Sequence, residues 1–218
     1  ICEGFIDESI GVERAVKKGY EIIGSLIGSS LLMEYGSYHV YMHDVVREMA
    51  LWIASDFRKQ KDNFIVQAGI GLNKIPKVQN WNIVRRMSLM SNKFDRISSS
   101  LDCLELKTLF LHQNQRLASI SGAFFMNMPR LVLLNLSGNR NLYELPDEIS
   151  QLVSLKYLNM SNSSLQCLPV GFRKLKVLTH LNLDATENLS SAVGISALLN
   201  LKVVKLWKSK VSYDLNTV

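Results

Sequence analysis

Cysteine is scarce in this chain of 218 residues, and the three cysteines that occur lie far apart. Cys2, Cys103 and Cys167 show no C-x-x-C spacing. Scattered cysteines in odd number argue against a disulfide framework or a zinc site and favour a reducing compartment. We therefore predict no metal site, and we expect Cys103 and Cys167 to serve as small buried hydrophobic residues.

Long apolar and long basic runs are also missing. No stretch reaches the roughly 18 apolar residues of a transmembrane helix, and no signal-peptide pattern stands at the start. The net charge is +6, but its clusters are short, which favours a solvated surface and predicts no nucleic-acid partner. We predict a cytoplasmic protein. Because residue 1 is Ile, we expect the natural N-terminus to lie upstream, where a membrane-association signal would have to be sought.

The residues of common catalytic sites are not brought together. The phosphate-binding pattern G-x-x-x-x-G-K-[ST] does not occur, since no Lys-Ser or Lys-Thr pair follows Gly69 and Gly71. No acidic pair follows a hydrophobic strand as a magnesium site requires, and no nucleophile and base are paired. We predict that the chain is not an enzyme and that it neither hydrolyses ATP nor binds nucleotide tightly alone.

What the chain does contain is a repeat. Residues 131–146 read L-x-x-L-x-L-x-x-N-x-x-L-x-x-L-P, and spacings of 22, 25, 24, 23 and 23 residues separate six matching frames. These spacings are typical of leucine-rich repeats. The frames begin at Val84, Leu106, Leu131, Leu155, Leu178 and Leu201.

Each frame has a physical reason. Leu134 and Leu136 alternate with Asn135, which predicts a short strand that points two leucines inward. Asn139 stands where the chain leaves the strand, and its amide can bond backbone groups of that turn. The same place is held by Asn92 and Asn114, then by Ser163, Thr186 and Ser209. We predict about six irregular stacked repeats that continue beyond residue 211, where no polar capping segment is seen.

The outer side of the predicted strands forms the concave face, which usually does the binding in such solenoids. We expect Thr108, Leu133 and Asn135 among the outward residues. Aromatic and histidine side chains there are candidates for contact with a protein partner, either a foreign protein or another part of the same chain. They are Phe110, His112, Tyr157, His180 and Trp207.

The first 60 residues do not fit the repeat. Helical spacing runs from an acidic start at 7–9 to about Gly28, and a hairpin turns at 35–37. A second helix is predicted from about Asp44, its expected N-cap, to Ser55. This order of helix, hairpin and helix outlines a winged-helix domain.

The predicted fold class is α+β, a winged-helix subdomain followed by a leucine-rich-repeat solenoid. We place the winged helix at 1–60, a linker and repeat cap at 61–82, and the repeats at 83–218. A short strand is expected at 64–66, and Trp81 is expected to cover the first repeat.

Residues 41–55, YMHDVVREMALWIAS, are more specific than this outline. They closely resemble the MHD motif of plant intracellular disease-resistance proteins of the nucleotide-binding, leucine-rich-repeat type, in the subgroup with a coiled-coil N-terminus. Segments at 4–6, 19–24, 75–78 and 86–92 resemble that family's flanking regions in the same order. The resemblance therefore covers the whole chain.

The resemblance implies an upstream nucleotide-binding domain of the same chain that holds ADP at rest and ATP when active. It implies that His43 approaches the ADP phosphates, that Asp44 orients the turn, and that Met42 is buried and positions both. A helix N-terminus suits a phosphate, and an imidazole there can donate a hydrogen bond. The resemblance also implies that the repeats recognise a pathogen effector or a modified host protein, that they restrain the switch, and that the intact protein oligomerises on activation.

Two other readings stay open. The repeats can be a plain protein-binding scaffold, with residues 1–56 as a cap. The second predicted helix can also be read as a DNA-recognition helix, but Arg47 is its clearest cation, which makes a poor phosphate-binding surface.

Overall fold

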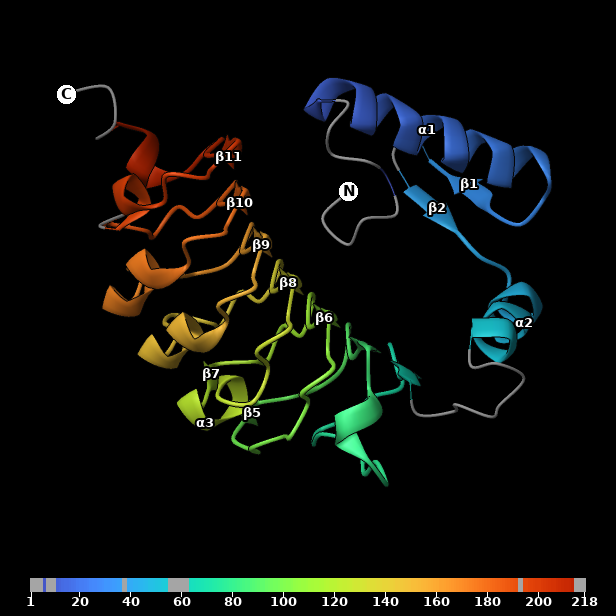
Figure 1. Ribbon diagram of the computed structural model, residues 1–218, viewed down its shortest axis with the longest axis horizontal. Helices are drawn as coiled ribbons and strands as arrows, with labels where there is room; N and C mark the ends of the chain where they lie inside the picture. Colours follow the sequence, from blue (N-terminus) through green and yellow to red (C-terminus); the bar gives the residue numbers. More distant parts are fainter. Residues whose placement is uncertain (1–5, 7–10, 37–38, 55–62, 192–193, 214–218) are drawn as a thin grey trace. The chain divides into compact units, whose positions relative to one another are not determined.

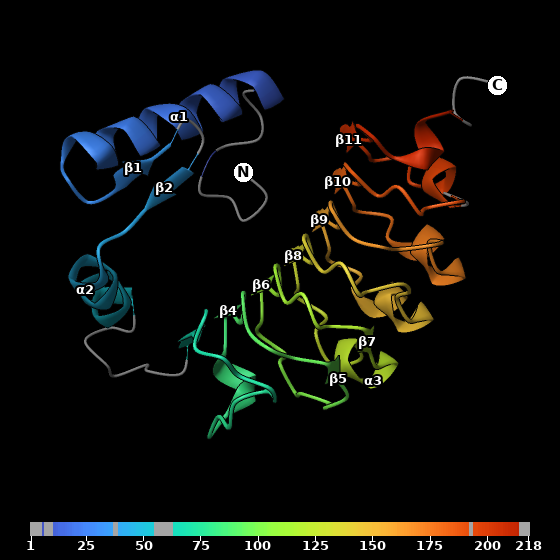
Figure 2. The same ribbon diagram turned by 180° about the vertical axis from the view of Figure 1, so that it is seen from behind.

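The computed structural model describes residues 6, 11–36, 39–54, 63–191 and 194–213. The chain divides into two compact units, an N-terminal unit of Ile1–Phe64 and a repeat unit of Ile65–Val218. Most helices and strands of both units are labelled in Figure 1, and β4 is labelled in Figure 2.

The N-terminal unit consists of a helix, a hairpin and a second helix. Helix α1 spans Val12–Gly28 and α2 spans Asp44–Ala54. Between them, β1 (Met33–Tyr35) pairs antiparallel with β2 (His39–Tyr41). The expected order of elements is therefore present, while the expected helix start at 7–9 and the turn residue 37 lie outside the described residues.

Both helices of this unit expose apolar side chains. Among the described residues of the N-terminal unit, Ala15 alone is a buried hydrophobic residue. The unit therefore leaves the apolar faces of its two helices exposed. Exposed apolar surface of this extent is typical of an interface. The exposed side chains are Val16, Tyr20, Ile22 and Ile23 on α1, and Val45, Met49, Trp52 and Ile53 on α2.

The repeat unit is built on a seven-stranded sheet in the order β11-β10-β9-β8-β6-β4-β3. Six strands begin two residues after the six predicted frame starts, and the predicted strand at 64–66 adds the seventh. Each adjacent pair from β4 to β11 is parallel and keeps one register. The strands are β3 (Phe64–Val66), β4 (Arg86–Ser88), β6 (Thr108–Phe110), β8 (Leu133–Asn135), β9 (Tyr157–Asn159), β10 (His180–Asn182) and β11 (Val203–Lys205).

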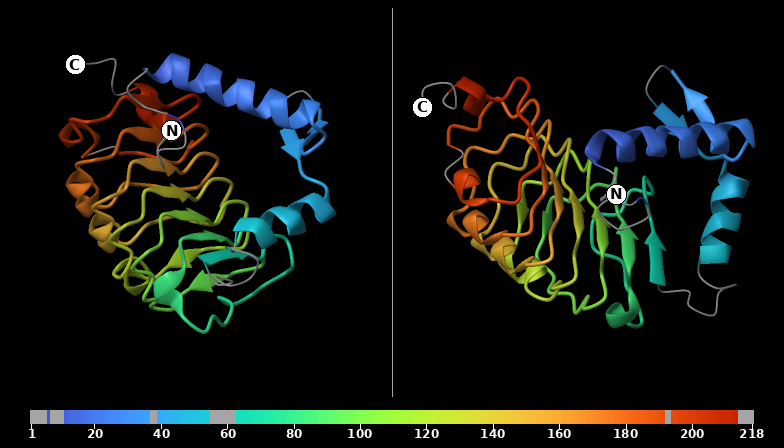
Figure 3. Two further views of the ribbon diagram at one scale, coloured as in Figure 1. Left: turned by 45° about the vertical axis from the view of Figure 1, so that its right-hand side comes forward. Right: turned by 45° about the horizontal axis from the view of Figure 1, so that its top comes forward.

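Short helical segments occupy the other side of the repeat unit, away from the sheet, as Figures 1 and 2 show. They are α3 (Gly122–Phe125) and the 3₁₀ segments η3 (Asp147–Gln151), η4 (Val170–Lys174), η5 (Ile195–Ala197) and η6 (Lys210–Tyr213). A further 3₁₀ segment, η2 (Trp81–Ile83), precedes β4, and β5 (Arg96–Ile97) pairs with β7 (Ser119–Ile120). The coils stack along one direction (Figure 3).

One continuous core runs through the repeat unit from Ile65 to Val211. The inward leucines of the frames form it, and Leu134 and Leu136 are fully buried as predicted. In the last coil Val204, the equivalent of Leu181, is 40% exposed. Among the described strands, none pairs with the outer edge of β11, which explains this exposure.

The asparagines at the turns bond across the coils as the sequence predicts. Asn139 accepts the backbone N–H of Asn114 at 2.8 Å, and Asn114 accepts that of Asn92 at 2.7 Å. The Asn139 amide also donates to the Leu136 and Leu111 carbonyls at 2.7 and 3.1 Å. Backbone groups that the turn leaves unpaired thus obtain partners inside the core. In the later coils, Ser163 and Thr186 donate to the carbonyl three residues earlier.

The residue just before each of these turn positions has a left-handed backbone, with φ between +53° and +71°. In the first five of these residues the N–H donates to a carbonyl of the next coil, as in Ala185 to Trp207 at 2.7 Å. Glycine and asparagine adopt this conformation most readily, yet four of the six residues are of other types. The six are Ser91, Gln113, Gly138, Asn162, Ala185 and Lys208.

Candidate functional site

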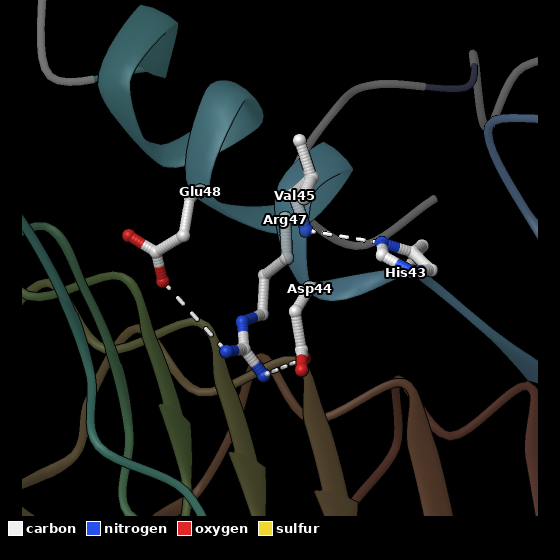
Figure 4. Close-up of polar contacts among 5 residues, drawn as sticks. All are labelled: His43, Asp44, Val45, Arg47 and Glu48. Carbon is white, nitrogen blue, oxygen red and sulfur yellow. Dashed lines mark hydrogen bonds and ion pairs between the residues drawn. The ribbon is translucent and has the colours of Figure 1, made fainter.

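The turn before α2 places His43 at the helix N-terminus. Its carbonyl accepts the N–H of Arg47 at 2.9 Å, which is the first bond of the helix. Its Nδ1 accepts the N–H of Val45 at 3.2 Å (Figure 4). Both bonds define an N-cap, so His43 caps α2. The prediction that Asp44 is the N-cap was wrong, because Asp44 is already the first helical residue.

This cap restricts the chemistry of the imidazole. An Nδ1 that accepts a hydrogen bond carries a lone pair, so the ring proton of His43 lies on Nε2. The neutral ring therefore has one N–H to offer to a ligand. Doubly protonated His43 has no acceptor and loses the cap.

An exposed ion-pair chain follows the cap. Arg47 lies 3.3 Å from the Asp44 carboxylate and 3.7 Å from that of Glu48 (Figure 4). Pairs as exposed as these contribute about 0–1 kcal/mol, so the Asp44 carboxylate is available to other partners. Met42 is half-buried rather than fully buried as the resemblance implied, whereas His43 and Asp44 are exposed.

The sheet face carries the second candidate site. The predicted contact residues fall into two ring pairs and one separate ring. Phe110 and His112 meet edge to face with centroids 5.7 Å apart. Tyr157 and His180 lie on neighbouring strands with centroids 6.2 Å apart. Trp207 is 68% exposed, with the Lys208 ammonium 4.5 Å from its ring centroid.

His112 is held in an apolar setting. Burial lowers its pKa below the usual 6.5, and its Nδ1 has no hydrogen-bond partner in the described part of the chain. The ring therefore favours the neutral form. The Nδ1 of His180, unlike that of His112, has a polar neighbour, since it lies 2.9 Å from the Thr179 hydroxyl.

Thr108 lies at an outward position of its strand as the frame predicts, but its side chain is covered. Its relative exposure is 4%, and its hydroxyl has no partner among the described residues. In the register of the sheet it lies between Arg86 and Leu133. A short side chain between two long ones is easily covered, which the frame alone does not reveal.

The frame places Asn135, Asn159 and Asn182 at outward positions, but it does not predict that they form one ordered row of hydrogen-bonded amides. Asn135, Asn159 and Asn182 are adjacent in register and half-buried. Each Oδ1 accepts the backbone N–H two residues later, at 2.9 to 3.0 Å. The available signal was their common place in the frame, four residues after Leu131, Leu155 and Leu178.

The described residues contain no group of three or more His, Cys, Asp or Glu side chains that can hold a metal ion. Within the same residues, no helix has the length and apolar character needed to cross a membrane.

Comparisons with known proteins bear on both units. The family described as leucine rich repeat matches residues 105–165 and 129–187. A probable disease resistance protein of Arabidopsis thaliana is 57% identical over 210 residues, which cover 94% of this chain and 24% of that protein. From the same plant, disease resistance protein UNI is 52% identical (98% of this chain, 24% of that protein) and disease resistance protein RPS5 is 50% identical (100% and 25%).

The chain spans about a quarter of the length of these curated relatives. Among solved structures, the Toll–Spätzle complex of Drosophila matches 60% of this chain and 18% of that chain, with a TM-score of 0.46 and 19% identity. On the sequence identity, the chain is homologous over nearly its whole length to plant disease resistance proteins, and its repeats are leucine-rich repeats.

Proposed function

We propose that the chain is the part of a cytoplasmic immune receptor that links a nucleotide switch to recognition by leucine-rich repeats. The single observation that carries this proposal is identity of 50–57% over at least 94% of the chain with disease resistance proteins. The repeats bind a pathogen effector or a host protein that the effector has modified. The N-terminal unit is a winged helix that closes over ADP held by an upstream domain.

The geometry at His43 supports a role beside a phosphate. Its Nε2–H is the one donor left after capping, and it is not engaged by any described residue. The N-terminal end of α2 adds a partial positive charge. His43 would then donate to an ADP phosphate oxygen. Asp44, whose exposed pair with Arg47 contributes little, would orient the turn and hold the closed arrangement. No catalytic step is assigned to this chain, since its sequence lacks the phosphate-binding loop.

The exposed apolar face of α2 supports a partner within the same protein. Val45, Met49 and Ile53 are each more than half exposed and recur at helical spacing beside the capped turn. Three-quarters of the relatives' length lies outside this chain. The upstream nucleotide-binding domain is the occupant that the family resemblance implies. Oligomerisation of the intact protein follows when ATP replaces ADP and the closed arrangement is released.

The proposal is tested with full-length protein carrying Asp44→Val. The control is Glu48→Val, which removes the other carboxylate that pairs with Arg47 from the same exposed helix face. Asp44→Val is expected to lower the ADP retained through purification and to give a defence response without a trigger, whereas Glu48→Val changes neither.

The readouts are nucleotide content after denaturation and response on expression. A silent Asp44→Val protein that accumulates normally and keeps its ADP contradicts the switch and leaves a plain repeat scaffold as the better account.

A further inference from the structure

The asparagine row on the sheet face, formed by Asn135, Asn159 and Asn182, leaves its Nδ2 donors unused within the described part of the chain. In Asn135, Asn159 and Asn182 the Oδ1 is occupied by the N–H of Ser137, Ser161 and Asp184 respectively. That bond fixes which end of each amide is turned to the backbone. The Nδ2 groups are consequently left for a ligand, and no described residue accepts from them. Each offers two N–H donors.

The row is ordered before anything binds. The strands that carry it are adjacent and in register, so their donors repeat at about 4.8 Å, the spacing of neighbouring strands. All three side chains are half-buried and tied to their own turn. Little side-chain entropy remains to be lost on binding, which favours affinity.

Charge extends the row in one direction. Lys205 is the next residue in register after Asn182, and it is exposed. Asp184, two residues after Asn182, accepts the N–H of Trp207 at 2.7 Å, which occupies one of its carboxylate oxygens. The line from Asn135 to Lys205 is therefore made of donors and ends in a cation, which is complementary to a line of carboxylates.

The spacing selects the kind of acidic partner. Residues three and four apart on an α-helix repeat about 4.5–6 Å along its axis, which brackets the strand spacing. Residues on one side of an extended chain repeat at about 6.6–7 Å, which does not match the strand spacing of about 4.8 Å. A nucleic acid needs many phosphate-binding cations, and this line supplies Lys205 alone.

We propose that the sheet face of the repeats binds the acidic face of an α-helix of a protein partner, with its carboxylates aligned on Asn135, Asn159, Asn182 and Lys205. This inference rests on the part of the proposed function that assigns partner binding to the repeats, and it names the chemistry of that partner. It does not depend on the nucleotide switch.

The test uses full-length protein and two helical peptides of one composition. The first carries glutamates three and four residues apart along one face, and the second has the same glutamates scattered around the helix. Fluorescence anisotropy is expected to show that the first peptide binds at least about tenfold more tightly, since each charge-assisted hydrogen bond approaches a factor of ten.

Asn159→Asp and Asn182→Asp are the informative variants. Aspartate keeps the oxygen that accepts the turn N–H and replaces the outward donor by an acceptor. Each is expected to weaken the one-faced peptide about tenfold, and Lys205→Glu, at an exposed site, is expected to do the same. The matched controls are Asn141→Asp and Lys202→Glu, which make the same charge changes at exposed positions outside the strands.

Equal binding of the two peptides, equal losses in the controls, tighter binding of an extended acidic peptide, or no binding at all would overturn the inference. Nucleotide content of Asn159→Asp and Asn182→Asp is expected to equal that of the wild type. If the peptides bind as expected but Asp44→Val has no effect, the nucleotide switch alone is refuted. If Asp44→Val acts as expected but the peptides do not, this inference alone is refuted.

Discussion

Removal of Asn139 should destabilise the repeat unit more than removal of Asn114, although both are fully buried asparagines in the same place of the frame. The difference lies in the backbone groups that each leaves unpaired. Asn114→Ala orphans the N–H of Asn92, because the Leu89 and Leu111 carbonyls keep a second amide donor. Asn139→Ala orphans both the N–H of Asn114 and the carbonyl of Leu136.

The magnitudes follow from the cost of a buried unpaired group, about 1–3 kcal/mol, and of a lost hydrogen bond, about 1 kcal/mol. Asn114→Ala is expected to lower the free energy of unfolding by about 2–4 kcal/mol, and Asn139→Ala by about 1–2 kcal/mol more. The double variant also orphans the Leu111 carbonyl, which accepts from both amides. Its loss should exceed the sum of the single losses by about 1–2 kcal/mol.

Urea denaturation followed by circular dichroism measures these values. Asn139→Ser serves as the control, because Ser163 already donates to the carbonyl three residues earlier in its own coil. It should restore the bond to Leu136 and cost less than Asn139→Ala. Equal losses for the two alanine variants, or a double variant that is merely additive, would refute the shared-carbonyl reasoning.

Three further predictions concern backbone conformation, thiol reactivity and the pH dependence of stability. Ala185→Gly should stabilise the unit by about 0.5–1 kcal/mol and Gly138→Ala should destabilise it by about 1 kcal/mol, because both positions have left-handed φ; opposite signs in thermal unfolding would contradict this. Cys103 is buried as expected, whereas the expectation that Cys167 is buried was wrong, since Cys167 is exposed. Burial raises the pKa of the Cys103 thiol to about 12, so a thiol reagent should label Cys167 in the native protein and Cys103 only after unfolding, as read by mass spectrometry. Burial lowers the pKa of His112 in the folded state, so the unfolded chain binds more protons near the usual value of 6.5. Stability should therefore fall as the pH drops through about 6.5, and His112→Gln should flatten that slope in urea titrations; an unchanged slope would exclude His112 as its cause.

The repeats were predictable because one frame recurs six times, and each leucine in it has one physical task. The role of Asn139 was predictable as well, because a buried amide at a turn must bond backbone groups. The cap at His43 was not predictable in the same way. Asp44 is the better N-cap by residue type, and only the position of the first helical bond decides between the two.

The concave face shows the same limit. The frame places Thr108, Phe110 and Asn135 on one side of the strands, but it does not say which neighbour covers a short side chain. Nor does it say which end of an asparagine amide is used internally. The cover of Thr108 depends on its neighbours Arg86 and Leu133, which lie more than twenty residues away in the chain. The Asn135 amide is oriented by a local bond instead, because its Oδ1 accepts the N–H two residues later.

The exchange of asparagine for hydroxyl side chains along the turns has a mechanical consequence. Between Asn92 and Asn139 the turn side chains join neighbouring coils, whereas Ser163 bonds within its own coil. Because such arrays open through neighbouring units, deuterium should enter the amides around Asn114 most slowly and those around Ser163 more quickly. Past this coil the turn side chains again bond across coils, because the Thr186 hydroxyl donates to the Ser209 hydroxyl at 2.9 Å. A ligand that spans Asn159 and Asn182 should therefore slow deuterium exchange most around Ser163.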